Sequence, residues 1–238
     1  MKQYLDALRY ILENGTDRQS RTGISTRAVF GMQLRFDMKD GFPAITTKKL
    51  AWNAVASELL WFIEGSNDER RLAEILHGTR DKNKTTIWTA NAEADYWKPK
   101  AKFEGDLGRV YGVQWRKWKS PDGKEIDQLA NAINIIKENP TSRRIIVTAW
   151  NPGELNQMAL PPCHAFFQFF VANNKLSLQM YQRSCDMFLG VPFNIASYSL
   201  LLHMVAQATN LKPGEFVHVL ADTHIYHCLL YTSPSPRD

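Results

Sequence analysis

The chain has 238 residues, with 29 Lys and Arg against 24 Asp and Glu, which gives a formal net charge of +5. This length suits one large domain, and no linker divides it. The mild positive charge fits anionic small molecules as well as nucleic acid, so it excludes neither. No apolar stretch is long enough to span a bilayer, no signal-peptide pattern is present, and three cysteines are too few for a disulfide framework, so we expect a cytoplasmic protein.

The first half of the chain predicts two helices and a strand. Apolar residues at helical spacing predict a helix over residues 4–12, which Gly15 ends. Alternating residues predict a half-buried strand over 32–36. Residues 52–63 are apolar almost all round and predict a buried helix that carries Glu58. A buried carboxylate is costly unless it is paired or functional, so Glu58 is a candidate site residue. Residues 65–100 show the least regular pattern.

The second half predicts a mixture of strands and helices. A surface helix is expected over 127–138 and a buried strand over 145–148. Residues 165–172 and 176–181 predict adjacent strands joined by a tight turn at 173–175. A long apolar helix over 195–209 and a strand over 216–221 follow. Because the order lacks a strict βαβ rhythm, we expect an α+β fold, a single domain with one twisted mixed sheet covered by helices.

The predicted hairpin makes Cys163 a candidate nucleophile. A hairpin brings its outer ends together, so Arg183 is expected to lie near Cys163. A neighbouring arginine lowers the pKa of a thiol and favours the reactive thiolate near neutral pH. Taken alone, Cys163 is more typical of an inert core cysteine than of a nucleophile, and only the neighbouring Pro161–Pro162, His164 and Arg183 favour the nucleophile. Cys185 is interpreted as an inert core cysteine. No cysteine or histidine spacing predicts a metal site.

Several motifs in the same order resemble one family. From Met1 to about His227 the chain resembles the folate-dependent thymidylate synthases, in the motifs Asp40–Pro43, Thr46–Lys48, Glu58–Trp61, Gly108–Gly112, Gln114–Arg116, Ser142–Arg144, Pro162–Gln168, Gln182–Asp186, Gly190–Asn194 and Asp222–Tyr226. The resemblance implies reductive methylation of dUMP to dTMP, with 5,10-methylenetetrahydrofolate as the donor of carbon and hydride and dihydrofolate as the second product.

The resemblance also implies roles for individual residues. Cys163 would add to C6 of the uracil ring, Glu58 and Tyr111 would handle protons, and Arg183, Asn194 and Asp186 would complete the catalytic group. The implied contacts of dUMP are Arg21, Arg143, Arg144, Gln182, Arg183, Ser184, Asp186, Asn194, His224 and Tyr226. The implied contacts of the folate are Ile87, Trp88, Leu160, Asp186, Leu189, Gly190 and Phe193. Arg143 and Arg144 would reach the phosphate from the second subunit of a homodimer, and neither nucleic acid nor a membrane is needed.

Two departures from the family pattern affect the folate side. Ala51 replaces a histidine that touches the glutamate part of the folate in many members, although Lys48 remains nearby. Residues 228–238 match neither the family nor a core pattern and resemble a translated sequencing adapter. We therefore expect a domain over 1–227 followed by a foreign tail over 228–238. Without the family's C-terminal segment, the chain would bind dUMP weakly and turn over little.

Other functions fit less of the pattern. A deoxycytidylate hydroxymethylase would carry a carboxylate where this chain has Asn194. A zinc deaminase needs a second cysteine three residues after the first, where Phe166 stands. A cysteine hydrolase needs a histidine base, and His164 would point to the opposite face of a strand from Cys163. A basic nucleic-acid-binding module remains open and predicts basic residues on one exposed face.

Overall fold

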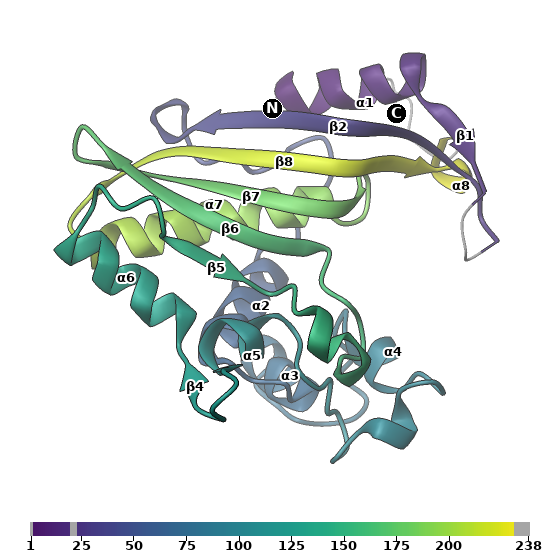
Figure 1. Ribbon diagram of the computed structural model, residues 1–238. Coiled ribbons are helices and arrows are strands. Elements are labelled where there is room, and N and C mark those ends of the chain that lie inside the picture. Colours follow the sequence, from purple (N-terminus) through teal and green to yellow (C-terminus); the bar gives the residue numbers. More distant parts are fainter. Residues whose placement is uncertain (1, 20–22, 231–238) are drawn as a thin grey trace.

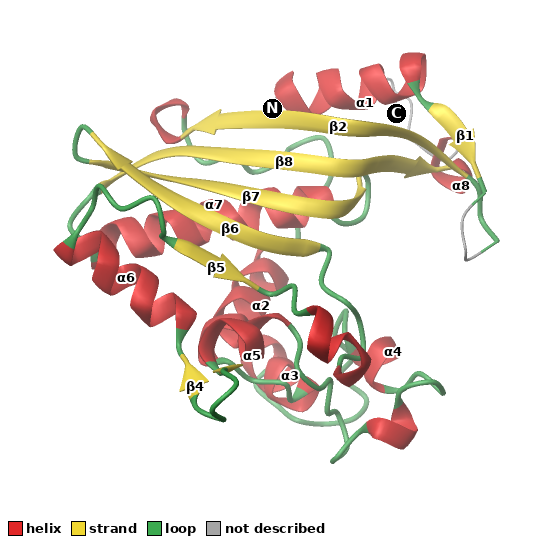
Figure 2. Ribbon diagram, in the orientation of Figure 1, coloured by secondary structure: helices red, strands yellow, loops and turns green. Residues whose placement is uncertain are grey.

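The computed structural model describes residues 2–19 and 23–230 and has the predicted α+β architecture. A mixed sheet of six strands is covered by helices, and the helices of residues 52–116 gather at one side of it (Figures 1 and 2). The helices are α1 (Lys2–Asn14), α2 (Trp52–Glu64), α3 (Glu69–His77), α4 (Thr89–Ala92), α5 (Tyr111–Arg116), α6 (Gln128–Glu138), α7 (Val191–Ala208) and α8 (His227–Leu230). The strands are β1 (Thr16–Arg18), β2 (Thr26–Asp37), β3 (Trp118–Lys119), β4 (Glu125–Ile126), β5 (Ile146–Thr148), β6 (His164–Ala172), β7 (Lys175–Asp186) and β8 (Lys212–Tyr226). None of the described helices is long and apolar enough to cross a membrane.

The sheet has the strand order β1-β2-β8-β7-β6-β5. Neighbouring strands are antiparallel except for β7 and β8, which are parallel. A parallel pair needs a crossover connection, and α7 provides it while packing on both strands. The segment from β7 to β8 is therefore a βαβ unit inside an otherwise antiparallel sheet.

The predicted hairpin of β6 and β7 is confirmed. Asn173 and Asn174 both adopt positive φ angles, of 50° and 59°. Such angles at both central positions are typical of a type I′ turn, which asparagine tolerates because its side chain bonds locally. The turn sets Ala172 opposite Lys175 and brings His164 opposite Gln182. The hairpin thus places the residues that follow Gln182 beside those that precede His164.

One face of the sheet forms the core and the other is largely uncovered. Leu178, Met180 and Phe216 are fully buried beneath α7 and join the main hydrophobic cluster. On the opposite face, Phe166 and Phe170 are exposed, and the Phe166 ring stacks on Tyr181 with 5.5 Å between ring centroids. An exposed aromatic surface on a sheet is a feature of interaction faces.

All the predicted helices and strands are present, but the helices α3, α4, α5 and α8 and the short strands β1, β3 and β4 were not predicted. The predicted strands over 32–36 and 216–221 are longer than expected and run as β2 and β8. The irregular pattern of residues 65–100 hides α3, whose first residues Glu69 and Arg70 are buried. These two side chains pair through hydrogen bonds of 2.6 Å, so they replace apolar residues on the inner face and interrupt the hydrophobic period.

Candidate active site

Hydrogen bonds from two distant segments fix the backbone of Cys163. Its amide donates to the Tyr111 hydroxyl oxygen at 2.7 Å, and its carbonyl accepts from the Arg183 amide at 2.8 Å. Tyr111 begins α5, and Arg183 belongs to β7. Cys163 itself lies just before β6 and is half-buried. The predicted proximity of Cys163 and Arg183 is therefore confirmed.

Arg183 binds the loop that leads into Cys163. Its Nε donates to the Pro162 carbonyl at 2.8 Å, and its Nη2 donates to the Pro161 carbonyl at 2.9 Å. The guanidinium also lies 5.3 Å from the centroid of the Trp150 ring. These contacts hold the cation in one position, and Nη1 takes no part in the two carbonyl bonds.

The predicted lowering of the Cys163 pKa is wrong for this structure. Burial raises the pKa of the thiol, and the positive charge of Arg183 lowers it by less. The net pKa therefore lies above the ordinary value of a cysteine. The thiolate is therefore a minor species of the free protein at neutral pH. A phosphate bound near Arg183 would weaken the effect of that cation further.

Glu58 is a perturbed carboxyl group on α2. Burial raises its pKa to about 7, and a hydrogen bond from Trp88 Nε1 at 2.7 Å opposes part of that rise. The Trp88 ring lies 5.8 Å from the Tyr111 ring. Glu58 therefore exchanges a proton near neutral pH next to the aromatic group that contacts Cys163.

Asn194 lies in a connected set of polar side chains. Its Oδ1 accepts from Gln182 Nε2 at 3.1 Å, and its Nδ2 lies 3.4 Å from His164 Nε2. His164 Nδ1 lies 2.9 Å from the Tyr198 hydroxyl, and burial lowers the His164 pKa to about 3. A neutral, buried His164 that is bonded at both ring nitrogens does not suit the role of a general base for Cys163.

The remaining predicted nucleotide contacts lie at the ends of β7 and β8. Asp186 Oδ1 accepts from the Phe188 and Leu189 amides at 2.9 Å, so one carboxylate oxygen shapes the turn before α7. His224 is paired with Asp186 in the sheet register, and its ring lies 5.4 Å from the Tyr226 ring. Ser184 lies between Arg183 and Asp186 on β7 and is half-buried. These residues thus lie at the ends of two neighbouring strands, next to Arg183, which binds the Cys163 carbonyl.

The sequence of this chain also matches a model of one protein family. The family model described as thymidylate synthase covers residues 2–231. The chain belongs to the thymidylate synthase family. The family implies a methyltransferase that acts on dUMP with methylenetetrahydrofolate as co-substrate. The match includes every described residue that the sequence nominated for the site.

The predicted folate contacts of this thymidylate synthase family member include unusually exposed apolar side chains. Ile87 is 80% exposed and Leu189 is 56% exposed, whereas the adjacent Trp88 is buried.

Lys48 Nζ donates to the Phe188 carbonyl at 2.8 Å and lies 5.6 Å from the Phe193 ring. The predicted folate contacts Leu160 and Gly190 are a half-buried side chain and the residue that precedes α7. Ala51, which departs from the family pattern, is exposed at the start of α2.

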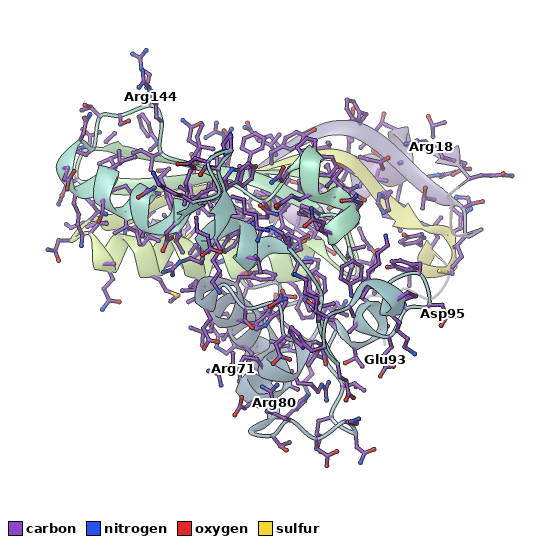
Figure 3. The ribbon with its side chains drawn as sticks, turned by 60° about the horizontal axis from the view of Figure 1, so that its bottom comes forward. Arg18, Arg71, Arg80, Glu93, Asp95 and Arg144 are labelled. Carbon is purple, nitrogen blue, oxygen red and sulfur yellow. The ribbon has the colours of Figure 1, made fainter. Side chains whose placement is uncertain are left out.

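The other predicted phosphate contacts do not join the group within this chain. Arg143 and Arg144 are exposed beside the edge strand β5, and the Arg143 carbonyl accepts from Gln168, which lies well along β6 from Cys163. Figure 3 shows Arg144 projecting away from the body of the protein. Arg21 lies outside the described residues, as do residues 231–238 of the predicted tail.

Three residues around the site were missed by the sequence interpretation. Tyr198 and His218 are buried. Tyr198 connects to Asn194 through His164, and His218 connects to Asn194 through Gln182. Trp150, which packs against Arg183, was not nominated either. The sequence offered one signal for His218, because it is a histidine within the apolar run of β8. Such a position predicts a buried polar side chain, and a buried polar side chain needs a hydrogen-bond partner.

Proposed function

We propose that the site of this chain belongs to an enzyme for the reductive methylation of dUMP to dTMP, with 5,10-methylenetetrahydrofolate as carbon and hydride donor. The observation that carries the proposal is the convergence of Tyr111 and Arg183 on Cys163, with Asn194 and Glu58 linked to the same group. Dihydrofolate is the second product. The folate supplies the one-carbon unit and the reducing hydride, and the residues of this chain do the rest.

Covalent addition by Cys163 activates the pyrimidine. The Sγ of the thiolate forms a bond to C6, and the electron pair of the C5–C6 double bond moves through the ring to O4. This step gives C5 the carbanion character that it otherwise lacks. A backbone held at both amide and carbonyl keeps the thiol at a fixed place, which supports such a role for Cys163. The same C–S bond breaks when dTMP is released.

Hydrogen bonds to the ring edge and two proton-handling groups support the later steps. Asn194 is proposed to hold O4 and N3–H, and its bond to O4 strengthens as charge develops there. Glu58, with a pKa raised to about 7, is proposed to relay protons to the O4 region through water. The Tyr111 hydroxyl, already near Cys163, is proposed to assist removal of the C5 proton.

The phosphate site is proposed to be shared between two subunits. Arg183 and Ser184 of one chain, with Arg21, would meet Arg143 and Arg144 of the other. The exposed position of Arg143 and Arg144 and the uncovered aromatic face of the sheet support a homodimer. Guanidinium groups suit this task because they bind phosphate oxygens in a bidentate way.

A covalent trap tests the proposal. The chain is incubated with 5-fluoro-dUMP and methylenetetrahydrofolate, because fluorine cannot leave as the C5 proton does. We expect a stable adduct at Cys163 by peptide mass spectrometry and its loss in Cys163→Ala. The matched control is Cys228→Ser, which removes an exposed cysteine of α8 and should leave the adduct intact. An adduct at another residue, or none in the presence of bound nucleotide, contradicts the proposal.

A second substitution tests the base contact. A carboxylate at position 194 accepts a hydrogen bond from the exocyclic amine of cytosine but repels O4 of uracil. Asn194→Asp should therefore shift nucleotide preference from dUMP towards dCMP. An unchanged preference for dUMP would show that Asn194 does not contact this edge.

A further inference from the structure

His218 is a fully buried polar side chain of the central strand β8. It lies on β8, opposite Leu34 of β2 and Met180 of β7, and none of its surface is exposed. Its Nε2 lies 2.8 Å from Gln182 Oε1, and its Nδ1 has no hydrogen-bond partner among the described residues. A polar ring in so apolar a place is costly, which calls for a reason for its presence.

The hydrogen bonds of Gln182 define which atom of His218 carries the proton. Gln182 Nε2 lies 3.0 Å from the Ser184 carbonyl oxygen and 3.1 Å from Asn194 Oδ1. A carbonyl oxygen only accepts, so the nitrogen of Gln182 must face Ser184, and its two protons are used on Ser184 and Asn194. Gln182 Oε1 is then left for His218, which must donate from Nε2. Burial lowers the His218 pKa to about 3, so the ring has one proton to give.

The assignment of donors and acceptors extends through Asn194. Since Asn194 Oδ1 accepts from Gln182, its Nδ2 faces His164 Nε2, which accepts, and His164 Nδ1 donates to the Tyr198 hydroxyl. Every bond then runs in one direction, from His218 through Gln182 and Asn194 to His164 and Tyr198. Hydrogen bonds that all run in one direction polarise and so strengthen one another. Turning one amide in the chain would therefore disturb its neighbours as well.

The direction of this chain of bonds matters because an amide can read either pyrimidine. Uracil presents a donor at N3 and an acceptor at O4, and cytosine presents the reverse pattern. Asn194 retains one donor and one acceptor outside the chain of bonds, so it matches uracil in one orientation and cytosine in the other. An asparagine free to turn would therefore discriminate weakly between the two bases.

We propose that His218 is a positioning residue that fixes the orientation of the Asn194 amide through Gln182 and thereby makes the site select uracil over cytosine. The inference rests on the proposed function, because it assumes that Asn194 contacts the pyrimidine. His218 does not touch the nucleotide in this scheme. Its contribution is to hold Gln182 Oε1, while the Ser184 carbonyl holds Gln182 Nε2.

The test compares dUMP and dCMP affinities, measured by calorimetry without folate. His218→Phe removes the donor, and the dCMP-to-dUMP ratio of dissociation constants should fall about tenfold, as expected for the loss of roughly 1.4 kcal/mol of discrimination. His218→Gln keeps an N–H donor and should restore most of the ratio. His203→Phe, which changes a half-buried histidine of α7 next to Phe42, is the matched control and should leave the ratio unchanged.

The outcomes separate this inference from the proposed function. Equal weakening of both nucleotides in His218→Phe would show a merely structural role and overturn the inference while leaving the proposed function intact. If the unmodified chain binds dCMP with the same affinity as dUMP, both the inference about His218 and the proposed function are overturned. If His218→Phe does not fold, long-range ¹H–¹⁵N spectra of the unmodified chain decide the matter. A proton on Nε2 of His218 is expected, and a proton on Nδ1 alone overturns the inference.

Discussion

The Tyr111 hydroxyl accepts a hydrogen bond from the Cys163 amide at 2.7 Å, across 52 residues of sequence. A phenol at the start of α5 thus fixes the backbone of the candidate nucleophile at the start of β6. Burial raises the Tyr111 pKa well above its ordinary value, so the group stays protonated and keeps its hydroxyl proton for another acceptor. The packing of α5 and the position of the thiol are therefore coupled.

Tyr111→Phe should reduce the reactivity of Cys163 strongly and the free energy of unfolding only modestly. The substitution leaves the Cys163 amide without an acceptor, at a cost of about 1–3 kcal/mol in the free energy of unfolding. Urea denaturation measures that cost, and the yield of the 5-fluoro-dUMP adduct should drop at least tenfold. Tyr10→Phe, on the exposed side of α1, is the control and should change neither quantity. An unchanged adduct yield would dissociate the hydroxyl from the reactivity of Cys163.

Arg183→Met should raise the pKa of the Cys163 thiol further. The positive charge of Arg183 is the influence that lowers this pKa, and burial opposes it. The pH profile of alkylation by iodoacetamide, measured in a Cys228→Ser background, should shift to higher pH. Arg35→Met removes an arginine that pairs with Glu215 on the sheet and serves as the control. A shift to lower pH after Arg183→Met would contradict the assignment.

Glu58 should make the protein less stable as pH rises. Its pKa is about 7 in the folded state, against 4.5 for a glutamate in water, so the folded state holds the extra proton between these values. The free energy of unfolding attributable to Glu58 therefore falls as pH rises from 4.5 through 7. Urea denaturation of Glu58→Gln should lack this decline, because a glutamine does not titrate. Trp88→Phe removes a hydrogen bond that lowers this pKa, so its transition should lie at higher pH.

Gly112→Ala should displace α5 from α2. A Cβ at Gly112 would overlap the carbonyl oxygen of Phe62, and a backbone atom cannot move aside as the end of a flexible side chain can. We expect a loss of about 1–3 kcal/mol in the free energy of unfolding, together with a lower yield of adduct because Tyr111 moves with α5. Gly153→Ala, whose nearest contact would be 3.5 Å, should be nearly neutral. Equal stability of the two variants would show that α5 has room to shift.

The sequence predicted the parts of the site that depend on local patterns. The turn at Asn173 and Asn174 fixed the hairpin, and the hairpin placed Arg183 at Cys163. The net rise of the Cys163 pKa was not predictable, because it depends on burial by segments that are distant in the chain. The direction of the hydrogen bond between His218 and Gln182 was not predictable either. It depends on the position of the Ser184 carbonyl, and the pattern of side chains in a sequence does not encode where a backbone carbonyl points.

The helix α3 illustrates another limit. Its buried face carries Glu69 and Arg70, which bind each other, and Glu69 also accepts from the Thr86 and Thr89 hydroxyls. Periodicity analysis assumes that buried positions are apolar, so a buried ion pair conceals a helix. The expected boundary at residue 228 remains a prediction, because the family match ends at residue 231 and does not test it.

The βαβ unit formed by β7, α7 and β8 has a consequence for sequence change. It supplies Gln182, Arg183, Asn194, His218 and His224 from one continuous stretch of chain. Insertions between α3 and α5 can therefore lengthen the loops next to Ile87 and Trp88 without altering the spacing of the side chains that are proposed to contact the base. Relatives with very different lengths in that region should keep the same choice of pyrimidine, whereas a single-residue deletion between Gly190 and Asn194 would rotate Asn194 out of register with Gln182.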